Sequence, residues 1–91
     1  MTSYEFEVAA KNAAISVLHN QYKLDVPMER MHTVWFAHVL GDKKCLLWPQ
    51  IPGNTYYIEV AYNSVWPQLY VDVYEKNYYT IVPETDFNFT A

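Results

Sequence analysis

Residues 55–62, TYYIEVAY, and residues 68–74, QLYVDVY, decide the fold of this chain. Both stretches alternate side chains of different polarity, which is typical of a β-strand that buries one face. Residues 51–54, Ile-Pro-Gly-Asn, carry Pro and Gly where a type II turn needs them. A turn at this place pairs the first stretch with residues 43–48, and matching Val60 to Val71 pairs it with the second stretch.

One further strand is predicted upstream, over residues 32–40, which are rich in β-branched and aromatic residues. Gly41-Asp42 then suits a two-residue type II′ hairpin turn, with Gly at its first position. This turn pairs His38 with Cys45 and fixes which side chains share a face.

The amino-terminal residues predict a helix over 1–22. Apolar side chains recur there at three- and four-residue spacing, and Thr2 with Glu5 forms a capping-box pattern. Asp25 is expected to cap a short helical turn that starts at Pro27 and ends at Arg30. The expected fold is α+β: one N-terminal helix packed on a four-stranded antiparallel β-meander, in the order α-β-β-β-β.

Residues 1–91 are expected to form a single domain with no linker or repeat. The helix spans 1–22, the sheet region spans 31–82, and a tail spans 83–91. Residues 75–82 fit either a helical turn or an extended chain. The tail is expected to be loose, although Phe87 and Phe89 could fold back onto the domain.

The predicted register sorts the strand residues into two faces. The face expected to lie under the helix holds ten residues: Val34, Phe36, His38, Cys45, Leu47, Ile58, Val60, Leu69, Val71 and Val73. The opposite face is aromatic and acidic, and no second long helix is available to cover it. Its members are the candidate partner-binding residues: Trp35, Trp48, Tyr57, Glu59, Tyr70, Asp72 and Tyr74.

Composition excludes several classes of protein. Hydrophobic residues make up 52% of the chain and charged residues only 18%, which excludes an intrinsically disordered protein. The sequence holds no apolar run long enough to span a membrane, and the amino end lacks the features of a secretory signal. A single cysteine, Cys45, excludes an internal disulfide framework.

The net charge of −4 lies entirely in the second half of the chain. Residues 1–45 carry equal numbers of acidic and basic side chains, whereas residues 46–91 carry acids against Lys76 alone. Phosphate binding needs clustered Lys and Arg, so direct contact with nucleic acid is not expected. A basic protein partner is expected instead.

Glu59 and Asp72 are predicted to lie opposite or diagonal to each other across two strands, where like charges repel. One interpretation is that both are solvated among tyrosines. The second is that they await a Lys or Arg from a partner, held between carboxylates and the rings of Tyr57, Tyr70 and Tyr74. A metal site or a glycosidase-like acid pair is the third, although two carboxylates are few for a metal and the chain is small for a cleft.

His38 beside Cys45 is the one pair in the sequence that could act as base and nucleophile. Because both are predicted on the core face, packing is the favoured role and no catalytic residue is assigned. His19 and His32 lack metal-ligand spacing, so neither a metal nor a cofactor is expected. Lys43-Lys44 is interpreted as a solvated turn.

Residues 34–76 resemble a family of small uncharacterised proteins encoded by phages and prophages of Gram-positive bacteria. The resemblance rests on Val34-Trp35-Phe36, on residues 44–47, on Tyr56–Asn63 and on Leu69–Lys76. The family pattern has Ala at Cys45, Thr at Ala61 and Lys at Glu75. This resemblance implies a phage-encoded, cytoplasmic protein and transfers no functional residue.

The favoured function is a non-enzymatic accessory protein that binds, and inhibits, a host or defence protein through the aromatic-acidic face. Inhibition of the anti-CRISPR kind is one form of this hypothesis. Two alternatives stay open. The chain could be a small enzyme or ligand-binding domain that uses Glu59 and Asp72, or a homodimer that buries the same face.

Overall fold

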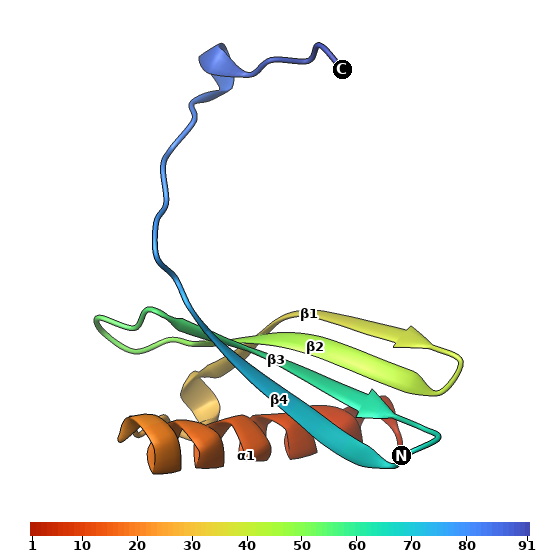
Figure 1. Ribbon diagram of the computed structural model, residues 1–91. Helices are drawn as coiled ribbons and strands as arrows, with labels where there is room; N and C mark the ends of the chain where they lie inside the picture. The colour runs from red at the N-terminus through yellow and green to blue at the C-terminus, as the bar shows by residue number, and fades with distance from the viewer.

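The computed structural model describes residues 1–91 and confirms the α+β fold (Figure 1). Four antiparallel strands pair in chain order, β1-β2-β3-β4, and the N-terminal helix lies against one side of the sheet. The elements are α1 (Ser3–Tyr22), η1 (Met28–Arg30), β1 (Met31–Val39), β2 (Asp42–Pro49), β3 (Tyr56–Asn63), β4 (Gln68–Glu75) and η2 (Glu84–Asp86).

Helix α1 begins with the capping box that the sequence predicts. The Thr2 hydroxyl accepts a hydrogen bond from the Glu5 N–H at 3.0 Å, and the Glu5 carboxylate accepts one from the Thr2 N–H at 2.8 Å. Its buried stripe is Phe6, Ala10, Ala14 and Leu18, at a spacing of four residues. The two alanines at the centre of the stripe let the helix approach the sheet closely.

The segment between α1 and β1 departs from its prediction at one residue. Pro27, not Asp25, occupies the N-cap position of the short turn η1, and no side chain caps it. The Asp25 carboxylate instead meets His19 Nδ1 at 2.6 Å, on the last turn of α1. The expected cap by Asp25 is therefore wrong, because a partner on the preceding helix takes its side chain.

The β1–β2 hairpin turns one residue earlier than predicted. Leu40 and Gly41 have φ values of 50° and 89°, and positive φ at both central residues is the signature of a type I′ turn. Val39 therefore pairs with Asp42, His38 with Lys43, and Phe36 with Cys45. The predicted II′ turn at Gly41-Asp42 and the His38–Cys45 pairing are wrong. Asp42 is held as the first residue of β2 because its carboxylate accepts hydrogen bonds from the Ser64 N–H and hydroxyl, both at 2.8 Å.

This register differs from the predicted one by two residues, so the side chains keep their faces. The predicted pairing of the other strands is confirmed: Leu47 lies opposite Ile58, and Val60 lies opposite Val71. A β-bulge between Thr33 and Trp35 displaces Val34, which is 57% exposed and does not join the core.

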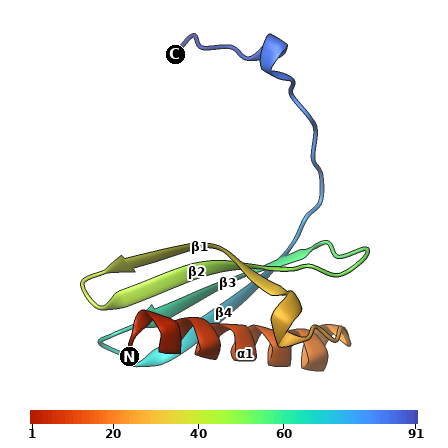
Figure 2. The same ribbon diagram turned by 180° about the vertical axis from the view of Figure 1, so that it is seen from behind.

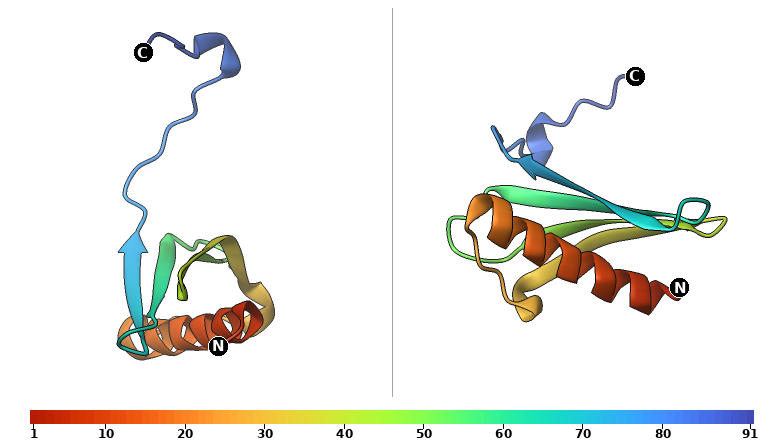
Figure 3. Two further views of the ribbon diagram at one scale, coloured as in Figure 1. Left: turned by 90° about the vertical axis from the view of Figure 1, so that its right-hand side faces the viewer. Right: turned by 60° about the horizontal axis from the view of Figure 1, so that its bottom comes forward.

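The core lies between α1 and the sheet. Cys45, Leu47, Ile58 and Val60 are fully buried, and Leu69, Val71 and Val73 pack against them. The centroids of the Phe36 and Phe6 rings lie 5.7 Å apart, but Phe36 remains partly exposed. His38 keeps its predicted face, opposite Lys43, but is exposed, and Val34 is displaced by the bulge, so the prediction that both belong to the core is wrong. Figure 3 shows the sheet arching over α1, with the edge strands β1 and β4 at its two sides.

The sheet ends at Glu75, and residues 76–91 form what we call the C-terminal arm. The arm leaves the sheet on the side away from α1 and extends into solvent (Figures 1 and 2). Every residue of the arm is exposed. The Phe87 and Phe89 rings pack against each other, with their centroids 6.2 Å apart. Residues 76–82 thus resolve as extended chain, and the two phenylalanines do not fold back.

Candidate functional site

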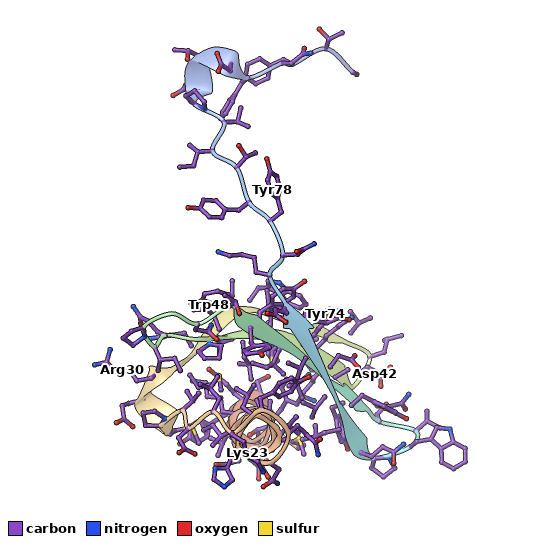
Figure 4. The ribbon with its side chains drawn as sticks, turned by 60° about the vertical axis from the view of Figure 1, so that its left-hand side comes forward. Lys23, Arg30, Asp42, Trp48, Tyr74 and Tyr78 are labelled. Carbon is purple, nitrogen blue, oxygen red and sulfur yellow. The ribbon has the colours of Figure 1, made fainter.

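The sheet surface that points away from α1, here called the outer face, carries all seven candidate partner-binding residues. Period-two alternation places them there, because Cys45 and Leu47 point into the core and their neighbours point outward. Trp35 lies directly opposite Leu46, and Tyr57 lies opposite Tyr74. Figure 4 shows Trp48 and Tyr74 near the base of the arm, with Lys23 on the helix side. The remaining members are Glu59, Tyr70 and Asp72.

Glu59 and Asp72 are directly opposite each other across β3 and β4, as the sequence predicts. Their repulsion is relieved within the chain, because Lys44 forms a salt bridge with Glu59. The hydrogen bond to Glu59 and its negative charge raise the pKa of Lys44, and Tyr74 and Asp72 add to the effect. Glu59 therefore does not need a cation from a partner, whereas Asp72 has no ionic partner in the structure.

The interpretation of Lys43-Lys44 as a solvated turn is wrong, because each side chain makes a specific contact. Lys44 serves the outer face. Lys43 points to the other side and is only 6% exposed, and its Nζ donates to the Gly41 carbonyl at 3.4 Å. The same ammonium lies 5.8 Å from the centre of the Tyr62 ring.

Aromatic rings gather at the end of the outer face where the arm begins. The Tyr57 and Tyr74 rings are stacked, with centroids 5.1 Å apart and an interplanar angle of 12°. Lys76 Nζ lies 5.5 Å from the Trp48 ring centre and 4.8 Å from that of Tyr79. Lys76 thus fills the aromatic end of the site with a cation from this chain, a contact that the sequence reasoning missed. Its period-two spacing from Tyr74 and Asp72 was the available signal.

A shallow hollow of about 340 Å³ opens at the opposite end of the sheet, beside the β1–β2 hairpin. The small side chains of Ala37 and Ala61 flank Lys44 across the sheet, and Ala61 separates it from Tyr70. Neither Glu59 nor Asp72 lines it, and Asp42, its one carboxylate, is bonded to Ser64. Those bonds lower the pKa of Asp42, so it is not an acid poised to donate a proton.

Cys45 and His38 do not form a nucleophile and base pair. Cys45 is fully buried, and burial raises the pKa of its thiol to about 11, which disfavours the reactive thiolate. His38 lies opposite Lys43 instead and is exposed, so the packing role predicted for His38 is wrong. The packing role assigned to Cys45 is therefore confirmed by its burial. No group of three or more His, Cys, Asp or Glu side chains in the structure could hold a metal ion.

The only long helix, α1, is not apolar enough to cross a membrane. No curated protein and no solved structure matches this chain. One family model, described as a family of unknown function (DUF6275), matches residues 7–84. The match runs from the first turns of α1 through all four strands and into the arm. This chain therefore belongs to the DUF6275 family.

Proposed function

We propose that this protein is a non-enzymatic binding protein that engages a partner protein through the outer face of its sheet. The observation that carries the proposal is the concentration of Trp and Tyr side chains with acidic groups on a surface that α1 leaves uncovered. Tyr and Trp are enriched where protein interfaces gain most of their binding energy. The convex arch of the sheet suits contact with a partner surface better than enclosure of a substrate (Figure 3).

The partner is proposed to be basic. The second half of the chain holds the whole net charge of −4, but on the outer face itself Lys44 and Lys76 lie beside Glu59 and Asp72, so the proposal of a basic partner rests on Asp72. Asp72 is exposed and has no ionic partner. The stacked rings of Tyr57 and Tyr74 form the next outward-facing cross-strand pair, two residues further along the strands. A Lys or Arg from the partner would meet both a carboxylate and aromatic faces there. The site proposed for the cation is therefore Asp72, since Lys44 already neutralises Glu59.

The finer proposal is a phage-encoded accessory protein that acts in the host cytoplasm and inhibits a host or defence protein. Support comes from the resemblance of residues 34–76 to proteins of phages and prophages. An acidic, aromatic surface could also occupy a basic nucleic-acid groove on such a target without binding nucleic acid itself.

The hollow beside the hairpin favours one second candidate, a small-ligand-binding domain. Its volume of about 340 Å³ is at the lower limit for small-molecule sites. An enzyme that uses Glu59 and Asp72 receives no such support, because both carboxylates lie outside the hollow.

The deciding experiment is affinity capture from a Gram-positive host lysate, followed by titration of the captured protein. Wild type is compared with Tyr57→Ala and Asp72→Asn, and Asn12→Ala on the exposed side of α1 is the matched control. We expect the two outer-face variants to weaken binding and the control to leave it unchanged. Binding should also weaken as salt rises. Equal affinity for all four proteins would refute the outer face as the binding surface.

A further inference from the structure

The C-terminal arm exposes apolar side chains that the folded domain does not cover, although Lys76 contacts the Tyr79 ring and Phe87 contacts Phe89. Tyr78 is 81% exposed, Ile81 80% and Phe89 89%, and Tyr79, Val82 and Phe87 are also exposed. Residues 78–82, Tyr-Tyr-Thr-Ile-Val, form an uncharged run of strong β-formers between Lys76 and Glu84. The family match extends to residue 84, so this run is part of the region that the family shares. An exposed, apolar, extended segment of this kind is suited to pair with the edge strand of a β-sheet.

Strand β1 is an edge strand, and its outer side is not paired with another strand. No strand lies beyond β1 in the sheet order, and the strand carries no Asp, Glu, Lys or Arg. Val39 beside the hairpin is 66% exposed, and Leu40 at its tip is 96% exposed. Proteins usually protect edge strands with charges or proline. The other edge strand, β4, follows that rule with Asp72 and Glu75, whereas β1 has only the bulge at Val34.

The arm does not reach the β1 edge of its own chain. Three inter-strand spacings separate β4 from β1, which is roughly 14 Å. The chain from Glu75 to Tyr78 extends about 10 Å, so the uncharged run begins short of that edge. The arm also leaves the sheet in a direction that carries it away from the domain (Figure 1).

We propose that two copies of this chain exchange their arms, with residues 78–82 of each copy added as a fifth strand beside β1 of the other. The exchange is reciprocal, so a two-fold axis closes the assembly at a dimer. The five-residue run matches the five residues of β1 that follow the bulge, Trp35–Val39. Backbone hydrogen bonds supply the pairing, and the apolar side chains of both strands cover each other.

The buried area bears on the stability of the dimer. Within the pairing run each arm carries two aromatic rings, those of Tyr78 and Tyr79, together with Ile81 and Val82. An aromatic side chain buries about 150–250 Å², so the four rings of two arms bury roughly 600–1,000 Å². The aliphatic side chains and the covered surface of β1 add to this area, which brings the interface toward the lower limit of standard stable interfaces, about 1,200 Å². The inference goes beyond the proposed function and leaves Asp72 and the Tyr57–Tyr74 pair open to a different partner.

The test is the solution mass of the full chain, measured by light scattering between about 1 and 100 μM. Thr80→Pro removes a backbone donor in the middle of the added strand, and Val39→Lys places a charge on the receiving edge. Thr90→Pro is the matched control, because it puts the same residue in the arm outside the pairing run. Both altered positions of the first pair are exposed, so the domain itself should fold normally.

We expect wild type and Thr90→Pro to be dimers, and Thr80→Pro and Val39→Lys to dimerise roughly tenfold more weakly or worse, since two sites are lost per dimer. A wild-type monomer at the highest concentration would overturn the proposal. A dimer that survives Thr80→Pro but is lost on Tyr74→Ala would also overturn it, in favour of contact between outer faces. The proposed function is scored separately, by the effect of Asp72→Asn on partner binding.

Discussion

The two faces of the same strands differ in how their side chains are satisfied. On the inner face, Ile58 and Val60 are fully buried against α1, and burial of apolar area holds them there. On the outer face, Tyr57 and Glu59 alternate with them in sequence but remain partly exposed and contact other side chains laterally. A step of one residue along β3 therefore changes a side chain from a stabilising role to one available for binding.

Lys43 and Lys44 show the same contrast with a single residue type. Lys43 points to the inner side and covers the Tyr62 ring, while its ammonium reaches a backbone carbonyl. Lys44 points to the outer side and neutralises Glu59. Neighbouring lysines thus protect the core edge and balance the acidic face. Charge counts along the sequence cannot distinguish these two roles.

The largest expected difference between the faces is in stability, at the neighbouring positions Ile58 and Tyr57. Ile58→Ala leaves a cavity in the core and should lower the free energy of unfolding by about 2–5 kcal/mol. Tyr57→Ala removes one stacked ring and should cost about 0.5–1.5 kcal/mol. Urea denaturation followed by tryptophan fluorescence measures both. Equal losses would show that the outer face also belongs to the core.

The β2–β3–β4 register could be predicted because the loop at 51–54 and the Val60–Val71 match leave few alternatives. The position of the β1–β2 turn could not be predicted, because leucine rarely adopts the positive φ that Leu40 has here. In addition, Asp42 is held in β2 by hydrogen bonds from Ser64, a residue remote in sequence. The Lys44–Glu59 salt bridge could have been predicted, because the predicted register places the two side chains diagonally on the same face. The direction of the arm has no local sequence signal.

A substitution at Cys45, also on the inner face, should lower the free energy of unfolding by less than Ile58→Ala does. Cys45→Ser keeps the size of the side chain but buries a hydroxyl, which costs about 1–3 kcal/mol if it finds no partner. Thermal unfolding should show the loss, and partner binding by the folded variant should stay at the wild-type value. A folded variant that no longer binds would contradict the packing role.

The same thiol predicts a loss of stability at high pH. Burial raises the pKa of Cys45 from 9.0 to about 11, so the unfolded chain releases its proton first. The stabilising contribution is complete below pH 9.0 and is lost as the pH rises toward about 11. Cys45→Ala is the control, because it lacks the thiol and keeps every other ionisable side chain of the wild type. Wild type should lose stability more steeply than this control, and parallel pH profiles would contradict the prediction.

Asp72→Asn should produce the smallest change in stability and the clearest separation of the two faces. The substitution removes repulsion with Glu59, a cross-strand effect of roughly 0.2–1 kcal/mol, and also removes some attraction for Lys44. These effects oppose each other, so we expect the free protein to be unchanged or slightly more stable. Glu59→Gln is the matched comparison and should lower stability, because it leaves Lys44 without its salt bridge.

Binding should respond to Asp72→Asn in the opposite sense. If a partner cation meets Asp72 in a desolvated interface, loss of the charge should weaken binding by more than about 1 kcal/mol, roughly fivefold. Calorimetric titration with the captured partner measures this change, and thermal unfolding of the same samples measures stability. A role confined to the fold would lower the melting temperature and leave affinity unchanged. A solvated carboxylate without function would change neither quantity. Only a binding role gives unchanged stability together with weaker binding, so this pair of measurements decides whether the outer face is a binding surface.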